Sequence, residues 1–417
     1  MKDHSIFSIW RTRPTTALAI AVLLSSLLML NLRAEKADTA ETSTPPQQGL
    51  SAETRARAEK AIHRGVTLLL STQQENGSWS KNTFPALTAF PAWALTRSHC
   101  DNVKEPIQKA CAFITSCVSD GGMFKGAIYV PVQETKGGGL INYNTAVCMT
   151  ALHATGDAAF HQIILDARAF LSRSQYLGKQ THHGGMGYDP PTGRNYADLS
   201  NSYLAYEAMH VTSDIEDLRK GEKVKLDWNA AIEFIQRCHN DPAFNDQAWA
   251  SDDPSERGGF AYRPDEFREN SGAFKAPDGT LKFRTMPGMS YAGLLSYVYA
   301  GIDRNDPRVA ATVKWITANW QLERGNRNPD MTGKPEELEG LYYMYNVMSK
   351  GLNAYGQDVL VLADGTSLNW RESMIQKLVS LQAEDGSWSN TNGRYWESDK
   401  TLVTSYILLA LETCLGR

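Results

Sequence analysis

The chain lacks a surplus of positive charge. Its 417 residues include 42 Lys and Arg against 46 Asp and Glu, so the formal net charge is −4. Proteins that bind nucleic acid typically carry a basic face that attracts the phosphate backbone. The composition therefore excludes nucleic acid from the expected partners.

Cysteines are few and follow no disulfide framework. The six of them stand at irregular spacings in apolar, helix-like segments: Cys100, Cys111, Cys117, Cys148, Cys238 and Cys414. Disulfide frameworks are typical of short, loop-rich chains that cannot build a sufficient core. We expect buried free thiols, with disulfides as the alternative in an exported chain.

A long apolar run occurs near the N-terminus, and it is short for a membrane-spanning helix. It extends over residues 17–32, follows Arg11 and Arg13, and precedes the small residue Ala34. This pattern favours a cleaved export signal over residues 1–34, with an uncleaved membrane anchor as the alternative. Residues 35–52 are polar and aperiodic, which predicts a disordered linker. We expect an exported protein of the periplasm or cell envelope.

The most informative pattern in the sequence is a repeated word. Two near-identical copies stand at 71–80 and 380–389: Ser71, Gln73, Glu75, Gly77, Ser78, Trp79 and Ser80 recur as Ser380, Gln382, Glu384, Gly386, Ser387, Trp388 and Ser389. Weaker copies occur at 121–124, 184–188 and 258–262. Repetition across nearly the whole chain predicts one repeat domain, residues 53–417, instead of several separate domains.

Each copy of the word lies between an amphipathic and a wholly apolar helical segment. The predicted amphipathic helices are 58–70, 107–117, 163–174, 228–238, 309–320 and 370–382. The predicted apolar helices are 86–95, 143–154, 199–209, 291–300, 341–355 and 402–415. A helix without a polar face is buried, so the pattern predicts an inner and an outer set of six helices.

The glutamines and tryptophans of the word have a structural interpretation. A glycine just past a helix end can stop the helix, and a glutamine there can satisfy free backbone groups beside a packed ring. We therefore expect Gln73, Trp79, Gln382 and Trp388 to hold the repeats together and not to bind a ligand.

These words resemble the Gln-Trp repeat of squalene-hopene and oxidosqualene cyclases, a family that includes the β subunits of protein prenyltransferases. Further similarities are Gly184 to Tyr188 followed by 198–201, and Trp396-Glu397 ahead of 402–406. Together they are similar to exported bacterial proteins with prenyltransferase and squalene oxidase repeats. The resemblance implies an all-α fold, an α/α toroid in which six inner helices surround a central cavity.

The catalytic motifs of those families are missing. The nearest match to the Asp-x-Asp-Asp acid of the cyclases is Asp252-Asp253, with Ala at position 250. The prenyltransferase zinc set needs Asp-x-Cys and a later His, whereas Glu412-Thr413-Cys414 is followed by no His. No cofactor or metal is therefore predicted. Both Asp252-Asp253-x-x-Glu256 and His182-His183 are interpreted as solvated loops, with metal sites as the alternatives.

Parallel inner helices would bring their N-termini together at one mouth of the cavity. We predict a general acid there in Glu397 or Asp198, because neighbouring aromatic rings could desolvate either carboxyl group. The predicted ligand-binding residues share this location: Tyr143, Asn144, Tyr188, Asn201, Tyr262, Tyr291, Tyr342, Tyr343, Trp396 and Asp399. Helix capping is the alternative for Asn144, Asp198 and Asp399.

Three functions stay open at this stage. The first is binding, or conversion by a cyclase-like isomerase or transferase, of an isoprenoid or other apolar molecule. The second is a glycan-binding or glycan-cleaving toroid, which predicts an open groove with paired carboxylates. The third is a non-catalytic envelope scaffold with a plugged cavity and an apolar outer patch.

Overall fold

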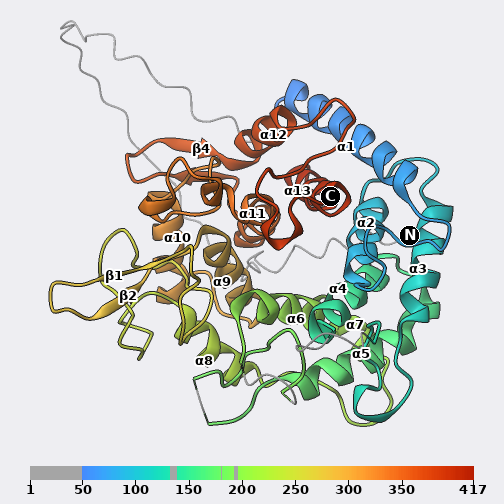
Figure 1. Ribbon diagram of the computed structural model, residues 1–417, viewed down its shortest axis with the longest axis horizontal. Coiled ribbons are helices and arrows are strands. Elements are labelled where there is room, and N and C mark those ends of the chain that lie inside the picture. Colours follow the sequence, from blue (N-terminus) through green and yellow to red (C-terminus); the bar gives the residue numbers. More distant parts are fainter. Residues whose placement is uncertain (1–48, 132–138, 180, 192–195) are drawn as a thin grey trace, which may run out of the picture.

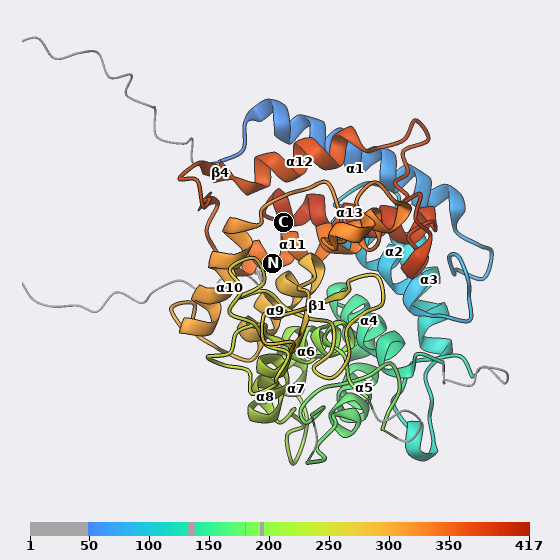
Figure 2. The same cartoon turned by 60° about the vertical axis from the view of Figure 1, so that its left-hand side comes forward.

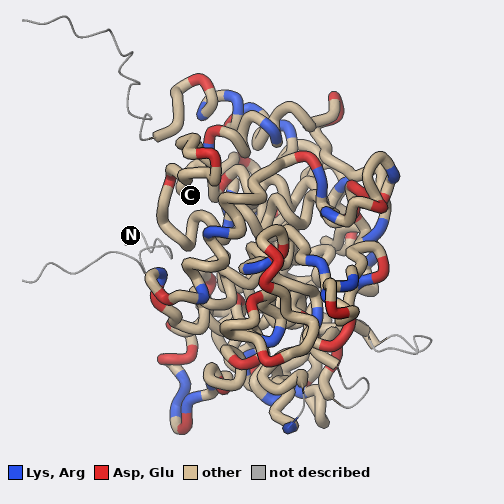
Figure 3. Tube along the Cα trace, turned by 90° about the vertical axis from the view of Figure 1, so that its left-hand side faces the viewer, with Lys and Arg blue, Asp and Glu red and all other residues tan. Residues whose placement is uncertain are grey.

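The structure is a computed structural model that describes residues 49–131, 139–179, 181–191 and 196–417. The predicted leader, residues 1–34, and residues 35–48 of the predicted linker lie outside the described residues. No helix in the described ranges is long and apolar enough to cross a membrane. Lys and Arg are interspersed with Asp and Glu along the trace of the body (Figure 3).

Twelve helices of seven or more residues within the described part form two sets that alternate along the chain. The outer set is α1 (Ala52–Thr72), α3 (Lys104–Ser116), α5 (His161–Ser174), α8 (Trp228–Cys238), α10 (Pro307–Ala318) and α12 (Trp370–Ser380). The inner set is α2 (Ala86–Arg97), α4 (Ile141–Ala154), α6 (Leu199–Val211), α9 (Pro287–Tyr299), α11 (Leu341–Tyr355) and α13 (Lys400–Cys414). The predicted number and type of helices are confirmed, and most ends agree within two residues.

The inner helices close into a ring. Each of them packs against the next inner helix along the chain, and α13 packs against α2 to complete the circle (Figure 1). The fold is therefore the α/α toroid that the resemblance implies. Helices of the inner set are buried on every side: all residues of α13 from Thr401 to Cys414 are buried. Their hydroxyl groups are satisfied within the helix, as when Ser405 donates to the Thr401 carbonyl at 2.8 Å.

The two near-identical words lie on either side of the point where the ring closes. Here α1 packs beside α12, as both ribbon views show (Figures 1 and 2). The Gln382 side chain donates to the Ala61 carbonyl of α1 at 2.9 Å, and Arg64 donates to the Ala383 carbonyl at 2.6 Å. Gln73 makes the same kind of bond to the Pro106 carbonyl of α3 at 2.9 Å. The structural interpretation of both glutamines is confirmed.

The glycine of each word meets the backbone of the next outer helix. Five glycines with φ between 83° and 100° would each place an added Cβ against a carbonyl oxygen of that helix: Gly77, Gly126, Gly184, Gly258 and Gly386. Two residues later, a backbone N–H donates to a hydroxyl of the following inner helix. Trp79 N–H donates to Thr88 at 3.1 Å, and Trp388 N–H donates to Thr404 at 3.2 Å. Each word thus joins an outer helix to an inner one.

The prediction of a copy of the word at 121–124 is wrong. Residues Gly122–Phe124 form a short 3₁₀ turn, η1, in which Met123 is exposed. The structural equivalent of Gly77 and Trp79 is instead Gly126 with Ile128, whose N–H donates to Thr145 of α4 at 2.9 Å. The double glycine at 121–122 was the stronger sequence signal, but a Cβ on either residue would meet nothing.

The remaining elements are short. They are the helix α7 (Ser213–Glu216), the 3₁₀ turns η2 (Ala158–Phe160), η3 (Pro329–Met331), η4 (Pro335–Leu338) and η5 (Arg394–Trp396), and the strands β1 (Ala273–Lys275), β2 (Leu281–Phe283), β3 (Val359–Val361) and β4 (Ser367–Asn369). The strands pair as two antiparallel hairpins, β1 with β2 and β3 with β4. The long linker 239–286 between α8 and α9 carries the first hairpin, which projects at the edge of the ring beside α8 and α10 (Figure 1).

Candidate functional site

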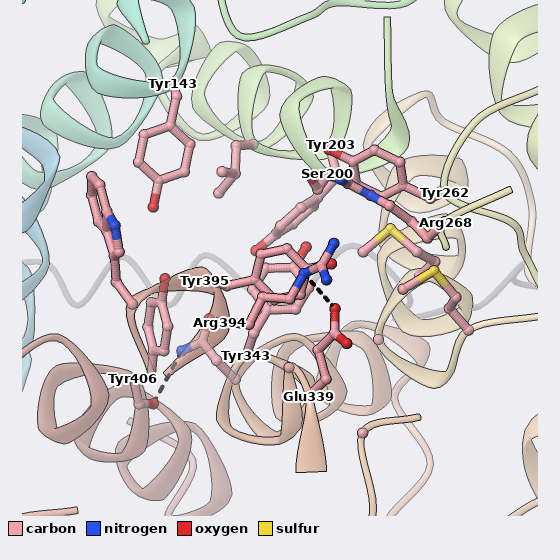
Figure 4. Close-up of a pocket in the computed structure, with 18 of the residues that line it drawn as sticks. Tyr143, Ser200, Tyr203, Tyr262, Arg268, Glu339, Tyr343, Arg394, Tyr395 and Tyr406 are labelled. Atoms are coloured by element: carbon pink, nitrogen blue, oxygen red, sulfur yellow. Dashed lines mark hydrogen bonds and ion pairs between the residues drawn. The ribbon is translucent and has the colours of Figure 1, made fainter. Parts of the chain in front are cut away.

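A cavity of about 440 Å³ lies where the inner helices begin. Its wall includes Tyr143 of α4, Tyr203 of α6 and Tyr343 of α11, all within the first two turns of their helices. Seven of the lining residues are tyrosines: Tyr143, Tyr188, Tyr203, Tyr262, Tyr343, Tyr395 and Tyr406. All of them except Tyr188 are labelled in Figure 4. Phe90, Leu204, Met286, Met289 and Trp396 complete a predominantly apolar wall. The size falls in the range of roughly 300–1,000 Å³ that small-molecule pockets have.

The tyrosine hydroxyls inside the cavity are neutral. Burial raises the pKa of Tyr143, Tyr262 and Tyr343 above the usual value of a phenol, so each keeps its proton at physiological pH. The Tyr188 and Tyr262 hydroxyls lie 3.4 Å apart and pair with each other. By contrast, the buried Tyr343 hydroxyl has no hydrogen-bond partner among the described residues. A free buried hydroxyl is costly, and a ligand could satisfy it.

Charged groups gather at one side of the cavity. Glu339 accepts from Arg394 at 2.8 Å and, through its other oxygen, from the Asn270 amide at 2.6 Å. Arg268 comes from the long linker before α9, and its guanidinium lies 3.6 Å from the centroid of the Tyr262 ring. The lining therefore holds two cations and one anion.

A buried ion pair connects inner helices α11 and α6 across the inside of the ring. The Lys350 ammonium on α11 donates to both oxygens of Glu207 on α6 at 3.0 and 3.1 Å, and to the Tyr203 hydroxyl at 3.2 Å. It also lies 4.3 Å from the centroid of the Trp93 ring on α2. Tyr299 on α9 adds a donor to Glu207 at 3.1 Å. Burial lowers the pKa of Lys350, and the Glu207 carboxylate opposes that shift. Four inner helices thus meet at one polar cluster.

Half of the predicted ligand-binding residues line the cavity. They are Tyr143, Tyr188, Tyr262, Tyr343 and Trp396. The other five lie elsewhere: Asn144, Asn201, Tyr291, Tyr342 and Asp399 are not part of the wall.

Capping accounts for two of these five residues. Asp399 accepts from Thr401 N–H at 2.9 Å and so caps its own helix α13. Asn144 accepts from Ala86 N–H at 3.0 Å and therefore caps the neighbouring helix α2. The remaining three are packed or paired behind the wall. Tyr342 stacks edge-on against Tyr345 at 5.7 Å, and Tyr291 is buried on α9.

Neither predicted acid reaches the cavity surface. Asp198 caps α6 by accepting from Asn201 N–H at 2.9 Å, and it also accepts from the Ser200 hydroxyl at 2.8 Å. Glu397 accepts from Tyr343 N–H at 2.7 Å, so it caps α11 and not the helix that it precedes. Each carboxyl group therefore contacts a wall residue from behind. Their assignment as general acids stays a prediction.

Burial of Glu397 makes a pH-dependent contribution to stability. Desolvation raises the pKa of its carboxyl group from 4.5 to about 7, although the Tyr343 N–H opposes the shift. Because the folded-state pKa is the higher one, this stabilisation is complete below pH 4.5 and is lost as the pH rises through about 7. Glu397→Gln should remove it. The difference in unfolding free energy between wild type and variant should then change by about 3 kcal/mol from pH 4.5 to pH 9.

The measurement is urea unfolding of both proteins at several pH values in that range. Comparing the variant with the wild type cancels the contributions of all other carboxyl groups. A difference that is constant with pH would contradict the burial of an ionisable Glu397.

The interpretation of both motifs as solvated loops is wrong for Glu256 and His182, because both side chains are buried. Glu256 is buried and accepts from the Thr285 hydroxyl at 2.6 Å, with Arg284 at 3.5 Å. His182 lies between the Asp265 carboxylate at 3.0 Å and the Ala197 N–H at 3.1 Å. Among the described residues no group of three or more His, Cys, Asp or Glu could hold a metal ion. The thiols are also unpaired: all six cysteines are free.

Several residues of the site are not among those predicted from the sequence. Tyr203 and Tyr406 stand in the interior of apolar helices, where rings normally signal core packing. Arg268, Glu339 and Arg394 occur in aperiodic linkers, and no local pattern sets them apart from solvated charges. The one usable signal was the excess of tyrosine around the starts of the inner helices.

Comparison with protein-family models gives no match, and comparison with curated protein sequences gives none. Solved structures do resemble the chain. The type II terpene cyclase MstE from Scytonema is 11% identical, with 87% of this chain and 99% of that one covered at a TM-score of 0.49. At this identity the likeness is one of fold alone. An α-1,6-mannanase from Salegentibacter is also 11% identical, with 87% and 100% covered at a TM-score of 0.48. Those two proteins catalyse different reactions, and neither reaction is assigned to this chain.

Proposed function

We propose that the central cavity binds a small molecule with an extended apolar body, such as an isoprenoid. The observation that carries this proposal is the aromatic cavity at the mouth of the ring, with the unpaired Tyr343 hydroxyl in its wall. Apolar and aromatic walls with a few polar groups are typical of small-molecule sites. The proposal concerns binding and assigns no reaction.

The structure offers less support for the two alternatives. A glycan-cleaving site would need a pair of free carboxylates, whereas Glu339, which lines the cavity, is engaged by Arg394 and Asn270. A docking scaffold would need a contiguous apolar surface. The exposed large apolar side chains instead belong to separate segments, among them Met123, Leu218 and Val361.

We also propose that the protein acts outside the cytoplasm, either released or held at a membrane by its N-terminal segment. The support is the run of apolar residues at 17–32 after Arg11 and Arg13. Cell fractionation of the tagged full chain, with N-terminal sequencing of the product, tests both export and cleavage.

Filling the cavity should weaken binding. Ser200 lines the cavity at the start of α6, and a tryptophan there would occupy the space that a ligand needs. We expect Ser200→Trp to weaken binding of the neutral isoprenoid alcohol farnesol at least about tenfold, since overpacking a filled site costs about 1–3 kcal/mol. Native mass spectrometry or titration calorimetry measures the change.

Ser200→Ala is the matched control. It also removes the hydrogen bond from Ser200 to Asp198, but it leaves the cavity open. The proposal is wrong if farnesol fails to bind the wild type, or if it binds Ser200→Trp as well as it binds Ser200→Ala.

A further inference from the structure

Arg268 differs from the other arginines of its surroundings in having no acidic partner. Arg263 pairs with Asp265 at 3.0 Å, and Arg394 pairs with Glu339 at 2.8 Å. The Arg268 guanidinium makes no ion pair within the described part of the chain, and its buried Nε has no hydrogen-bond partner there. An arginine at a cavity wall is thus left with donors to offer.

Aromatic rings hold Arg268 in place. Its guanidinium lies 3.6 Å from the centroid of the Tyr262 ring and 5.7 Å from that of Tyr395, and all three residues line the cavity (Figure 4). Cation–π contacts stabilise the charge without using the N–H donors in the plane of the guanidinium. The guanidinium of Arg268 is therefore held in position while its N–H groups stay available to an acceptor.

The local charge balance also favours an anion. Glu339, which lines the same side of the cavity, already accepts from Arg394 and from Asn270 with its two oxygens. Arg268 makes no ion pair within the lining, and the Asp198 carboxyl group behind the wall acts on its charge only through space. In a partly desolvated aromatic setting, a carboxylate or phosphate oxygen would satisfy both the charge and the free donors.

We propose that Arg268 binds the anionic group of an amphiphilic ligand whose apolar body fills the tyrosine-lined cavity. The ligand class is then an apolar chain that ends in a carboxylate or a phosphate. This inference rests on the proposed function, because it specifies what binds in the same cavity.

The test uses three probes with the same fifteen-carbon chain: farnesol, farnesoic acid and farnesyl phosphate. The wild type should bind at least one of the two anions about ten- to a hundredfold more tightly than the alcohol, because a charge-assisted hydrogen bond is stronger than a neutral one. The anion that gains most identifies the carboxylate or the phosphate as the natural group. Arg268→Gln should remove this preference, so that neither anion binds the variant more tightly than farnesol binds the same variant.

Two further variants keep the result interpretable. Arg268→Lys retains the charge without the fork and should retain part of the preference. Arg263→Gln removes an arginine of the same linker that is paired with Asp265, and it should leave the preference intact. Thermal unfolding of each variant checks that the linker still folds.

The outcomes separate the two proposals. If no probe binds the wild type, the proposed function fails. If farnesol binds and neither anion binds more tightly, the function stands and the role of Arg268 is wrong. The role is equally wrong if the anion preference survives in Arg268→Gln.

Discussion

Replacing Lys350 with methionine is expected to lower the free energy of unfolding by about 3–5 kcal/mol. The reason is the Glu207 carboxylate, which is 4% exposed and would lose the ammonium group that compensates its charge. Breaking a buried ion pair from one side costs more than the pair itself contributes, because an unpaired charge stays in the interior. Urea or thermal unfolding at neutral pH measures the loss.

The double variant Lys350→Met with Glu207→Gln is the decisive companion. It removes both charges and keeps an oxygen that can accept from Tyr299, which donates to Glu207 at 3.1 Å. We expect it to recover most of the lost stability. If the double variant is as unstable as Lys350→Met alone, then lost packing against Trp93 and not the stranded charge explains the effect.

Gly184→Ala is expected to destabilise the fold by more than about 3 kcal/mol. Gly184 has a φ of 92°, and an added Cβ would overlap the carbonyl oxygen of Ala230 on α8. Backbone strain of this kind alone costs about 1–3 kcal/mol. The overlap adds to it, because α8 must move away from the word that joins it to α6. Equilibrium unfolding and circular dichroism provide the measurement.

Gly156→Ala separates the two contributions. Gly156 has a φ of 68°, but a Cβ there would meet nothing within 4 Å. It therefore reports the cost of the backbone conformation without the overlap. A similar loss in both variants would show that close approach to α8 is unimportant.

The fold could be predicted from the sequence because each repeated motif marks both a helix end and a contact between helices. Gly77 with Trp79 and Gly386 with Trp388 mark the same joint twice, and the apolar segments between such joints can only be buried. The copy at Gly126 was missed because Ala127 stands where the other copies have Gly or Ser, and Ile128 stands where the two near-identical copies have Trp. The connection between the helices requires only one glycine packed against a carbonyl oxygen and one backbone N–H that donates to a hydroxyl. Many more sequences meet this requirement than match the Gly-Ser-Trp motif.

The residues of the candidate site could be predicted only in part, because the sequence does not give the direction of each side chain. Helix starts predict which residues lie near the mouth, but not whether a side chain points into the cavity or toward a neighbouring helix. Asn144 and Glu397 illustrate this, since each caps a helix other than its own. Arg268 lines the cavity although it belongs to the long linker 239–286, and no spacing in the sequence encodes the path of that linker.

Closure of the ring between α13 and α2 also has a consequence for folding cooperativity. In an open array of repeats, the terminal repeats have one neighbour each, and they can fray while the middle stays folded. The inner helices of this ring have two neighbours each, so none of them is an end from which unfolding would start. Loss of one helix pair would open two interfaces at once, which couples all six pairs into a single cooperative unit.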